Sequence, residues 1–108
     1  MDLRNIDEAK EWFEVLQTSA RTQTAMMTLA PGVSTGEKAE AHKESDQILL
    51  MLKGKLSGKV GEEKVRLGKG DVLVIPAGTP HRFKNSGRKS AVTFNVYSPP
   101  EYPIGMKG

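Results

Sequence analysis

The chain contains two histidines, His42 and His81, and no cysteine. Imidazole nitrogen is a common protein ligand for divalent transition metals, so the two rings either meet to hold a metal or are merely two polar residues on strands. His42 lies in "EAHKESDQILLMLKG" (40–54), and His81 follows "VLVIPAGTP" (72–80). The sequence offers no competing catalytic set, because it has neither a nucleophilic cysteine nor a glycine-rich phosphate loop. Its chemistry therefore depends on whether these two side chains meet.

The residues around His81 have a spacing in which each has a structural use. In "GDVLVIPAGTPHRFKN" (70–85), an apolar run ends at Pro76 and Gly78, which turn the chain where a ladder hydrogen bond cannot form. His81 then begins a new strand. The two-residue period of that strand places His81, Phe83 and Asn85 on one face and turns the intervening basic residues away.

This spacing resembles the second signature motif of the cupin family. In that motif, five residues separate a glycine from a proline, one separates the proline from a second glycine, two separate that glycine from a histidine, and three separate the histidine from an asparagine. These positions are matched by Gly70, Pro76, Gly78, His81 and Asn85. The resemblance extends over about residues 20–98. It implies an all-β fold, an antiparallel double-stranded β-helix or jelly-roll barrel. Because the cupin barrel hosts many unrelated functions, the resemblance says more about fold than about chemistry.

The stretch around His42 departs from the first cupin motif, which has two histidines and a glutamate ahead of a glycine. Counting back from Gly54, the spacing of that motif puts Gln47 in the glutamate position, His42 in the second histidine position and Glu40 in the first. In an alternative register, His42 takes the first position and Glu44 the second, which leaves too short a loop before Gln47. The first register is preferred because it preserves the strand that must pair inside the barrel.

In the preferred register, the resemblance implies that Glu40, His42, Gln47 and His81 converge near one mouth of the barrel. Glu40 and His42, two residues apart on one strand, would point the same way. Two imidazoles, a carboxylate and an amide oxygen suit Fe(II), Mn(II), Ni(II) or Zn(II) better than copper(I). Two functions stay open: a metal-binding cupin, including a metal-dependent enzyme for a small polar organic molecule, or a non-catalytic cupin that binds a small-molecule ligand without a metal.

Two kinds of element should position these residues. Residues 5–18 are predicted to form one short helix, capped at its start by Asn5 or Asp7 and packed on the barrel together with Trp12. The apolar residues that recur at helical spacing in it are Ile6, Ala9, Phe13 and Leu16.

The rest of the chain alternates with the two-residue period of strands. "RTQTAMMTLAPG" (21–32) predicts one strand, and six further short strands follow between glycines, which is typical of an antiparallel sandwich or barrel. Most large apolar residues are expected in the barrel core, while Tyr97 and Tyr102 would close its mouth or anchor the tail. The core residues expected are Met26, Met27, Leu49, Met51, Phe83 and Phe94. Residues 1–108 are predicted to be a single domain with an irregular tail over 99–108.

Composition narrows the range of partners. Net charge is +3, and the basic residues are interleaved with acids, which favours a solvated sheet face over a nucleic-acid partner.

The longest apolar runs are far shorter than the ~20 residues of a membrane span. The lack of cysteine and of a secretory signal predicts a cytoplasmic protein. A small-molecule ligand or substrate is the expected partner, and the family resemblance suggests a homodimer.

Overall fold

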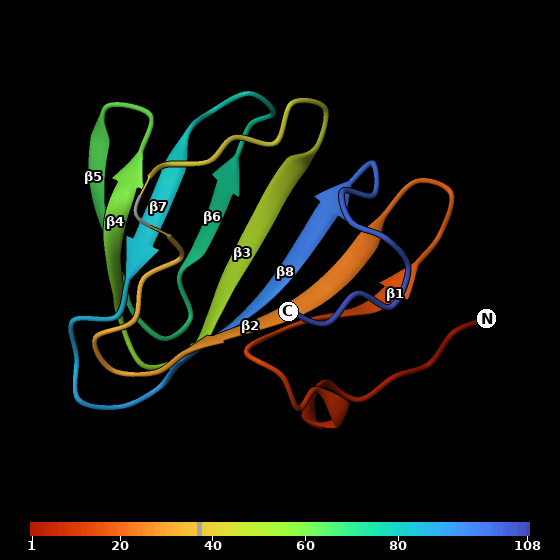
Figure 1. Cartoon of the computed structure of the whole chain (residues 1–108), viewed down its shortest axis with the longest axis horizontal. Coiled ribbons are helices and arrows are strands. Elements are labelled where there is room, and N and C mark those ends of the chain that lie inside the picture. Colours follow the sequence, from red (N-terminus) through yellow and green to blue (C-terminus); the bar gives the residue numbers. More distant parts are fainter. Residues whose placement is uncertain (37) are drawn as a thin grey trace.

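The computed structural model describes residues 1–36 and 38–108, and these fold into two antiparallel sheets that face each other (Figure 1). One sheet has the strand order β1-β2-β8-β3-β6 and the other β5-β4-β7. The strands of the first sheet are β1 (Phe13–Thr18), β2 (Gln23–Leu29), β3 (Asp46–Lys53), β6 (Val72–Ile75) and β8 (Ala91–Ser98). Those of the second are β4 (Leu56–Val60), β5 (Glu63–Leu67) and β7 (His81–Lys84). The predicted all-β double-stranded β-helix is confirmed.

The two-residue period of the strands builds the core between the sheets. Along β2, Ala25, Met27 and Leu29 are buried on the inner face, as predicted. Leu49 and Met51 of β3 meet them from the same sheet, and Phe83 closes the core from the other sheet. Met26 is buried on the opposite face of β2, where it pairs with the half-buried Phe94 of β8.

The helix predicted over residues 5–18 is wrong. A 3-10 helix, η1 (Ile6–Glu8), is followed by strand β1, which pairs with β2 so that Phe13 lies opposite Met27. The strand buries Phe13 and Val15 in the core and satisfies the backbone of β2, while Ile6 stays exposed. These tertiary gains outweigh the weak local preference for a helix, which the spacing of the apolar residues had suggested.

Two smaller expectations for this segment have different outcomes. Asn5 does act as a cap: its side chain accepts a hydrogen bond from the Asp7 N–H, and its own N–H donates to the Glu8 side chain. Trp12, expected to pack a helix on the barrel, instead lies half exposed beside Phe13, with ring centroids 5.9 Å apart.

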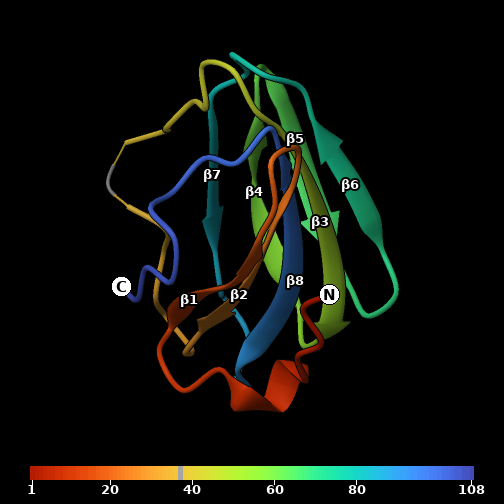
Figure 2. The same cartoon turned by 90° about the vertical axis from the view of Figure 1, so that its right-hand side faces the viewer.

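The tail over residues 99–108 contains no helix or strand, but it is anchored along the first sheet (Figure 2). The Val15 N–H donates to the Met106 carbonyl at 2.8 Å, and the Gly108 N–H donates to the Phe13 carbonyl at 2.8 Å. The tail therefore adds a partial further pairing to β1, the edge strand of this sheet. This position sets the tail over one end of the space between the sheets.

Candidate functional site

His42 and His81 lie side by side, with ring centroids 5.0 Å apart. The backbone brings them together: Glu40 and His81 exchange hydrogen bonds at 3.0 and 2.8 Å, and the Gly78 N–H donates to the His42 carbonyl at 2.7 Å. Gly78 has φ of +81°, a conformation that glycine adopts without strain. The strand expected to carry Glu40 and His42 is reduced to one isolated bridge, because the loop makes only these few bonds with the turn before β7.

Both imidazoles have their Nδ1 atoms next to an oxygen acceptor. His81 Nδ1 lies 3.0 Å from the Thr79 carbonyl oxygen, which can only accept, so Nδ1 carries the proton and Nε2 keeps its lone pair. His42 Nδ1 lies 3.5 Å from Glu101 Oε2, which favours the same tautomer. Burial lowers the pKa of His81, with the Thr79 carbonyl opposing this, so the ring is neutral at neutral pH. A neutral ring of this kind is suited to bind a metal or accept a hydrogen bond.

Gln47 adds an oxygen acceptor to the same site. Its side chain is 4% exposed on the inner face of β3, as predicted, and Nε2 donates to Asn95 Oδ1 at 3.0 Å. Among the buried side-chain nitrogen and oxygen atoms of residues 1–36 and 38–108, Gln47 Oε1 is the one without a hydrogen-bond partner. An unpaired buried acceptor costs free energy unless something else binds it.

Glu40 lines the cavity, but as a residue it is largely exposed to solvent. As directly opposed residues of an antiparallel pair, Glu40 and His81 have side chains on the same side of their backbones. The carboxylate is close enough to raise the pKa of His81, although burial has the larger, opposite effect. The structure thus brings the histidines and Gln47 together inside the barrel, with Glu40 at its rim.

These residues share a cavity of about 300 Å³ whose walls also carry five Trp, Phe and Tyr side chains. Tyr97 meets the edge of the His42 ring at a centroid distance of 5.3 Å, and Tyr102 lies 5.9 Å from that ring. Burial raises the pKa of both tyrosines, so their hydroxyls stay protonated at neutral pH. Phe13 and Trp12 complete this side of the cavity. Such a volume is at the small end of ligand-binding pockets in proteins.

The tail contributes several residues to the site, of which sequence reasoning had singled out only Tyr102. Tyr102 and Met106 line the cavity, and Glu101 supplies the carboxylate beside His42. The structure supports both roles considered for Tyr102. Its side chain lines the cavity, and its backbone, which is bound by the Gln23 side chain, anchors the tail. No motif marks Glu101, since it reaches His42 only through the path of an irregular segment.

Whether this site fits a metal depends on which types of side chain are counted as possible ligands. Within residues 1–36 and 38–108, no three His, Cys, Asp or Glu side chains lie in an arrangement that could hold a metal ion. Gln47 is not one of these four residue types, but its amide oxygen can bind a metal, and this oxygen is buried without a hydrogen-bond partner. Two imidazole nitrogens and one unpaired oxygen make a mixed set suited to a borderline divalent metal. In metal sites, the second ring nitrogen of a ligating histidine usually donates to a carbonyl or carboxylate, as Thr79 and Glu101 allow here.

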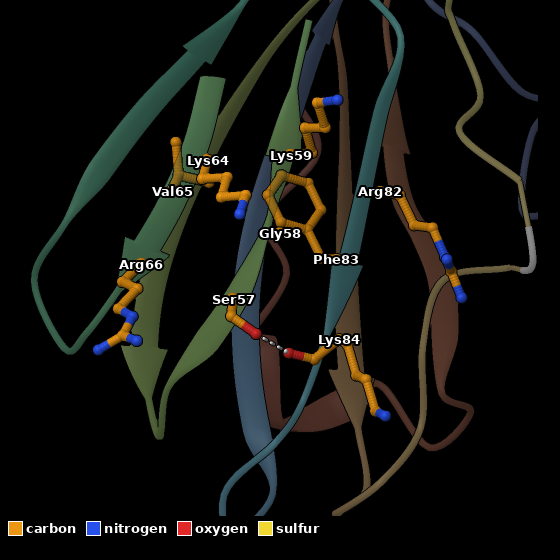
Figure 3. Close-up of a pocket in the computed structure, with 9 residues that line it drawn as sticks. All are labelled: Ser57, Gly58, Lys59, Lys64, Val65, Arg66, Arg82, Phe83 and Lys84. Carbon is orange, nitrogen blue, oxygen red and sulfur yellow. Dashed lines mark hydrogen bonds between the residues drawn. The ribbon is translucent and has the colours of Figure 1, made fainter. Parts of the chain in front are cut away.

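A second hollow of about 730 Å³ lies over the sheet β5-β4-β7 and is lined by basic side chains from all three strands (Figure 3). The strand pairing sets these residues in two rows, Arg66-Ser57-Lys84 and Lys64-Lys59-Arg82. In the second row, Lys59 lies directly between two other cations. This is the solvated sheet face that composition predicted, with its charges concentrated on one side.

Replacing Lys59 with glutamate is expected to raise the free energy of unfolding by a few tenths to about 1 kcal/mol, because it exchanges two cross-strand repulsions for two attractions. The existing ion pair with Glu62, at 3.7 Å, is too exposed to offset this. Urea unfolding at low and high salt measures the gain, which should shrink as salt screens the charges. Lys69→Glu, the same charge change in an exposed turn, is the control, and an equal gain there would contradict the local cause.

Comparisons with known proteins agree with this architecture. The family model for the Cupin domain matches residues 25–97. An uncharacterized protein of Acanthamoeba polyphaga mimivirus is 36% identical over 95 residues, which cover 84% of this chain and 58% of that protein. The uncharacterized protein YrkC of Bacillus subtilis is 31% identical over 96 residues, covering 83% of this chain and 50% of that protein. The chain thus spans about half the length of these curated relatives.

Among solved structures, a Bacillus halodurans protein superposes with a TM-score of 0.87 at 24% identity, covering 94% of this chain and 80% of that one. At that level of identity, the likeness concerns the fold alone. No helix within the described part of the chain is long and apolar enough to cross a membrane.

Proposed function

This chain belongs to the cupin family, and from that premise we propose that it is a metal-binding cupin whose cavity takes a small polar organic molecule. His42, His81 and Gln47 would hold a divalent transition metal such as Fe, Mn, Ni or Zn. Glu40, at the rim, is the fourth candidate ligand. The observation that carries the proposal is that Gln47, whose Oε1 is buried and unpaired, lines one cavity with two imidazoles whose ring centroids lie 5.0 Å apart.

The surroundings of the ligands support this proposal. Thr79 and Glu101 lie against the Nδ1 side of the two imidazoles, which leaves Nε2 as the atom that would bind a metal. When bound, the metal would supply Lewis-acid activation of a carbonyl or carboxylate, or binding of dioxygen. The chain itself would position the organic molecule against the aromatic wall of Tyr97 and Tyr102, and the tail would exclude water.

Metal analysis tests the proposal directly. Protein purified without chelator is expected to contain close to one transition metal per chain, and His42→Ala and His81→Ala should lose it because each removes a nitrogen ligand. Trp12→Phe is the matched control, since it changes the same cavity wall without removing a donor. Circular dichroism should show that all variants are folded. Wild-type protein that retains no metal after supply of Fe, Mn, Ni and Zn would overturn the proposal.

The second candidate is a cupin that binds a small organic ligand without a metal. The aromatic wall and the carboxylate beside His42 favour it, because both would serve a ligand that donates hydrogen bonds to Gln47 and to the imidazoles. A metal-free wild-type protein in the analysis above is the result that this alternative predicts.

The family resemblance also suggests a homodimer, and the outer face of the five-stranded sheet supports it. Ile48, Val72 and Val74 are 41%, 63% and 57% exposed there, next to the free edge of β6 (Figure 2). A second copy that covers this face would bury the apolar stripe. Light scattering is expected to give the mass of two chains, and the paired change of Val72 and Val74 to lysine should halve it. A wild-type mass equal to one chain would exclude the homodimer.

A further inference from the structure

We infer that Asn95 and Thr93 are positioning residues that decide which atom of Gln47 faces the cavity. They hold its amide oxygen, rather than its amide nitrogen, toward the bound group. The site would therefore accept a cation or a hydrogen-bond donor at this point and reject a group that can only accept. The inference rests on the proposed function, in which Gln47 is a ligand.

A buried chain of three hydrogen bonds carries the inference. The Thr93 hydroxyl donates to the Met27 carbonyl at 2.9 Å, and that carbonyl can only accept. Thr93 Oγ1 then accepts from Asn95 Nδ2 at 2.9 Å, which turns Asn95 Oδ1 toward Gln47. Gln47 must meet that oxygen with Nε2, at 3.0 Å, so its own oxygen is left on the other side. The direction of each hydrogen bond therefore fixes the direction of the next one.

The reverse arrangement is possible only if both amides flip. Asn95 Nδ2 would then donate to Gln47, and the Gln47 nitrogen would face the cavity and repel a metal. The Thr93 hydroxyl would have to donate to Asn95 and abandon Met27. Thr93 and Asn95 are both 0% exposed, so no water replaces a lost partner and the flip is costly. The cost of burying this polar ladder is understandable if it orients a ligand.

Thr93→Val tests the role of the hydroxyl with little change of shape. Without that acceptor, Asn95 is expected to turn its oxygen toward the valine, because an unpaired carbonyl is tolerated better than an unpaired N–H. Gln47 would then present nitrogen to the cavity. Zn²⁺ alone, titrated into chelator-stripped protein, should bind about tenfold or more weakly, the usual effect of losing an outer hydrogen-bond partner. Thr93→Ser keeps the hydroxyl and should restore the wild-type affinity.

Thr24→Val is the matched control, because its hydroxyl binds Gln17 in the same sheet, away from the cavity. Equal Zn²⁺ affinity in wild type and Thr93→Val would overturn the inference, as would an equal loss in Thr24→Val.

A metal-free measurement separates this inference from the proposed function. In the NMR spectrum of stripped protein, the Gln47 side-chain amide should show one exchange-protected proton, bound to Asn95, in wild type and in Thr93→Ser. That signal should change in Thr93→Val. Unchanged signals would overturn the inference even if the protein binds zinc. A wild-type protein that binds no zinc but shows the expected signals would overturn the metal proposal and leave the orientation of Gln47 supported.

Discussion

Gly58→Ala is expected to destabilise the protein by at least about 3 kcal/mol, because the new methyl group would overlap the neighbouring strand. A Cβ atom at position 58 would overlap the Arg82 carbonyl oxygen and lie 2.7 Å from Phe83 Cδ1. The first of these is backbone, which cannot move without separating β4 from β7. The second belongs to a core side chain that is 2% exposed. Urea unfolding followed by circular dichroism measures the loss.

The same substitution should also disturb the site. His81 and Phe83 lie on β7, and Val60 of β4 pairs with His81, so a displaced β7 moves one imidazole away from the other. Gly68→Ala is the matched control: a Cβ there meets only Asp71 Oδ2, at 3.9 Å, and its effect should be within about 0.5 kcal/mol. A Gly58→Ala protein as stable as this control would show that the two strands can separate without cost.

The fold and the inner face of β7 were predictable because their signals are local. A glycine, a proline and a second glycine at fixed positions specify the turn before β7, and the two-residue period then places His81 and Phe83 inside. The position of Gln47 on the inner face of β3 was predicted from the resemblance to the first cupin motif. The same resemblance implied that His42 lies beside His81, although the strand expected to carry His42 is only a bridge.

The remaining features depend on contacts between segments that are distant in the chain. Phe13 and Leu16 have the spacing of a helix, but their segment forms strand β1 because it can pair with the edge of β2. Glu101 reaches His42 through an irregular tail, which no periodicity describes. The unpaired state of Gln47 Oε1 depends on the direction of hydrogen bonds from Thr93 and Asn95, and these are buried on another strand. Sequence patterns give the face on which a residue lies, but not the partners that it finds there.

Gln23 is the residue whose loss should open the cavity. It is 0% exposed on β2, and its side chain binds the tail on both sides of its amide. Oε1 accepts from the N–H groups of Glu101 and Tyr102 at 3.1 and 2.9 Å, and Nε2 donates to the Tyr102 carbonyl at 2.8 Å. One side chain thus satisfies three backbone groups of an irregular segment, which has no ladder of its own to do so.

Gln23→Leu is expected to lower the free energy of unfolding by about 2–4 kcal/mol, because each buried group left unpaired costs about 1–3 kcal/mol and the tail can recover part of this by detaching into water. Detachment has a local signature. Amide hydrogen exchange over residues 99–108 should accelerate, and the exposure of Trp12 should rise, since Gly108 lies against its indole ring. Trp12 is the only tryptophan of the chain, so acrylamide quenching of its fluorescence reports this end of the cavity alone.

Gln17→Leu is the matched control for this experiment. Gln17 is on the neighbouring strand β1, and its side chain binds Thr24 and the Asp2 carbonyl rather than the tail. The exchange of residues 99–108 should therefore stay at the wild-type rate in this variant. Because the tail brings Glu101 to His42, Gln23→Leu should also weaken the binding of Zn²⁺ by stripped protein, whereas Gln17→Leu should not. If Gln23→Leu leaves tail exchange and Trp12 quenching unchanged, the contacts with β1 alone would be enough to hold the tail.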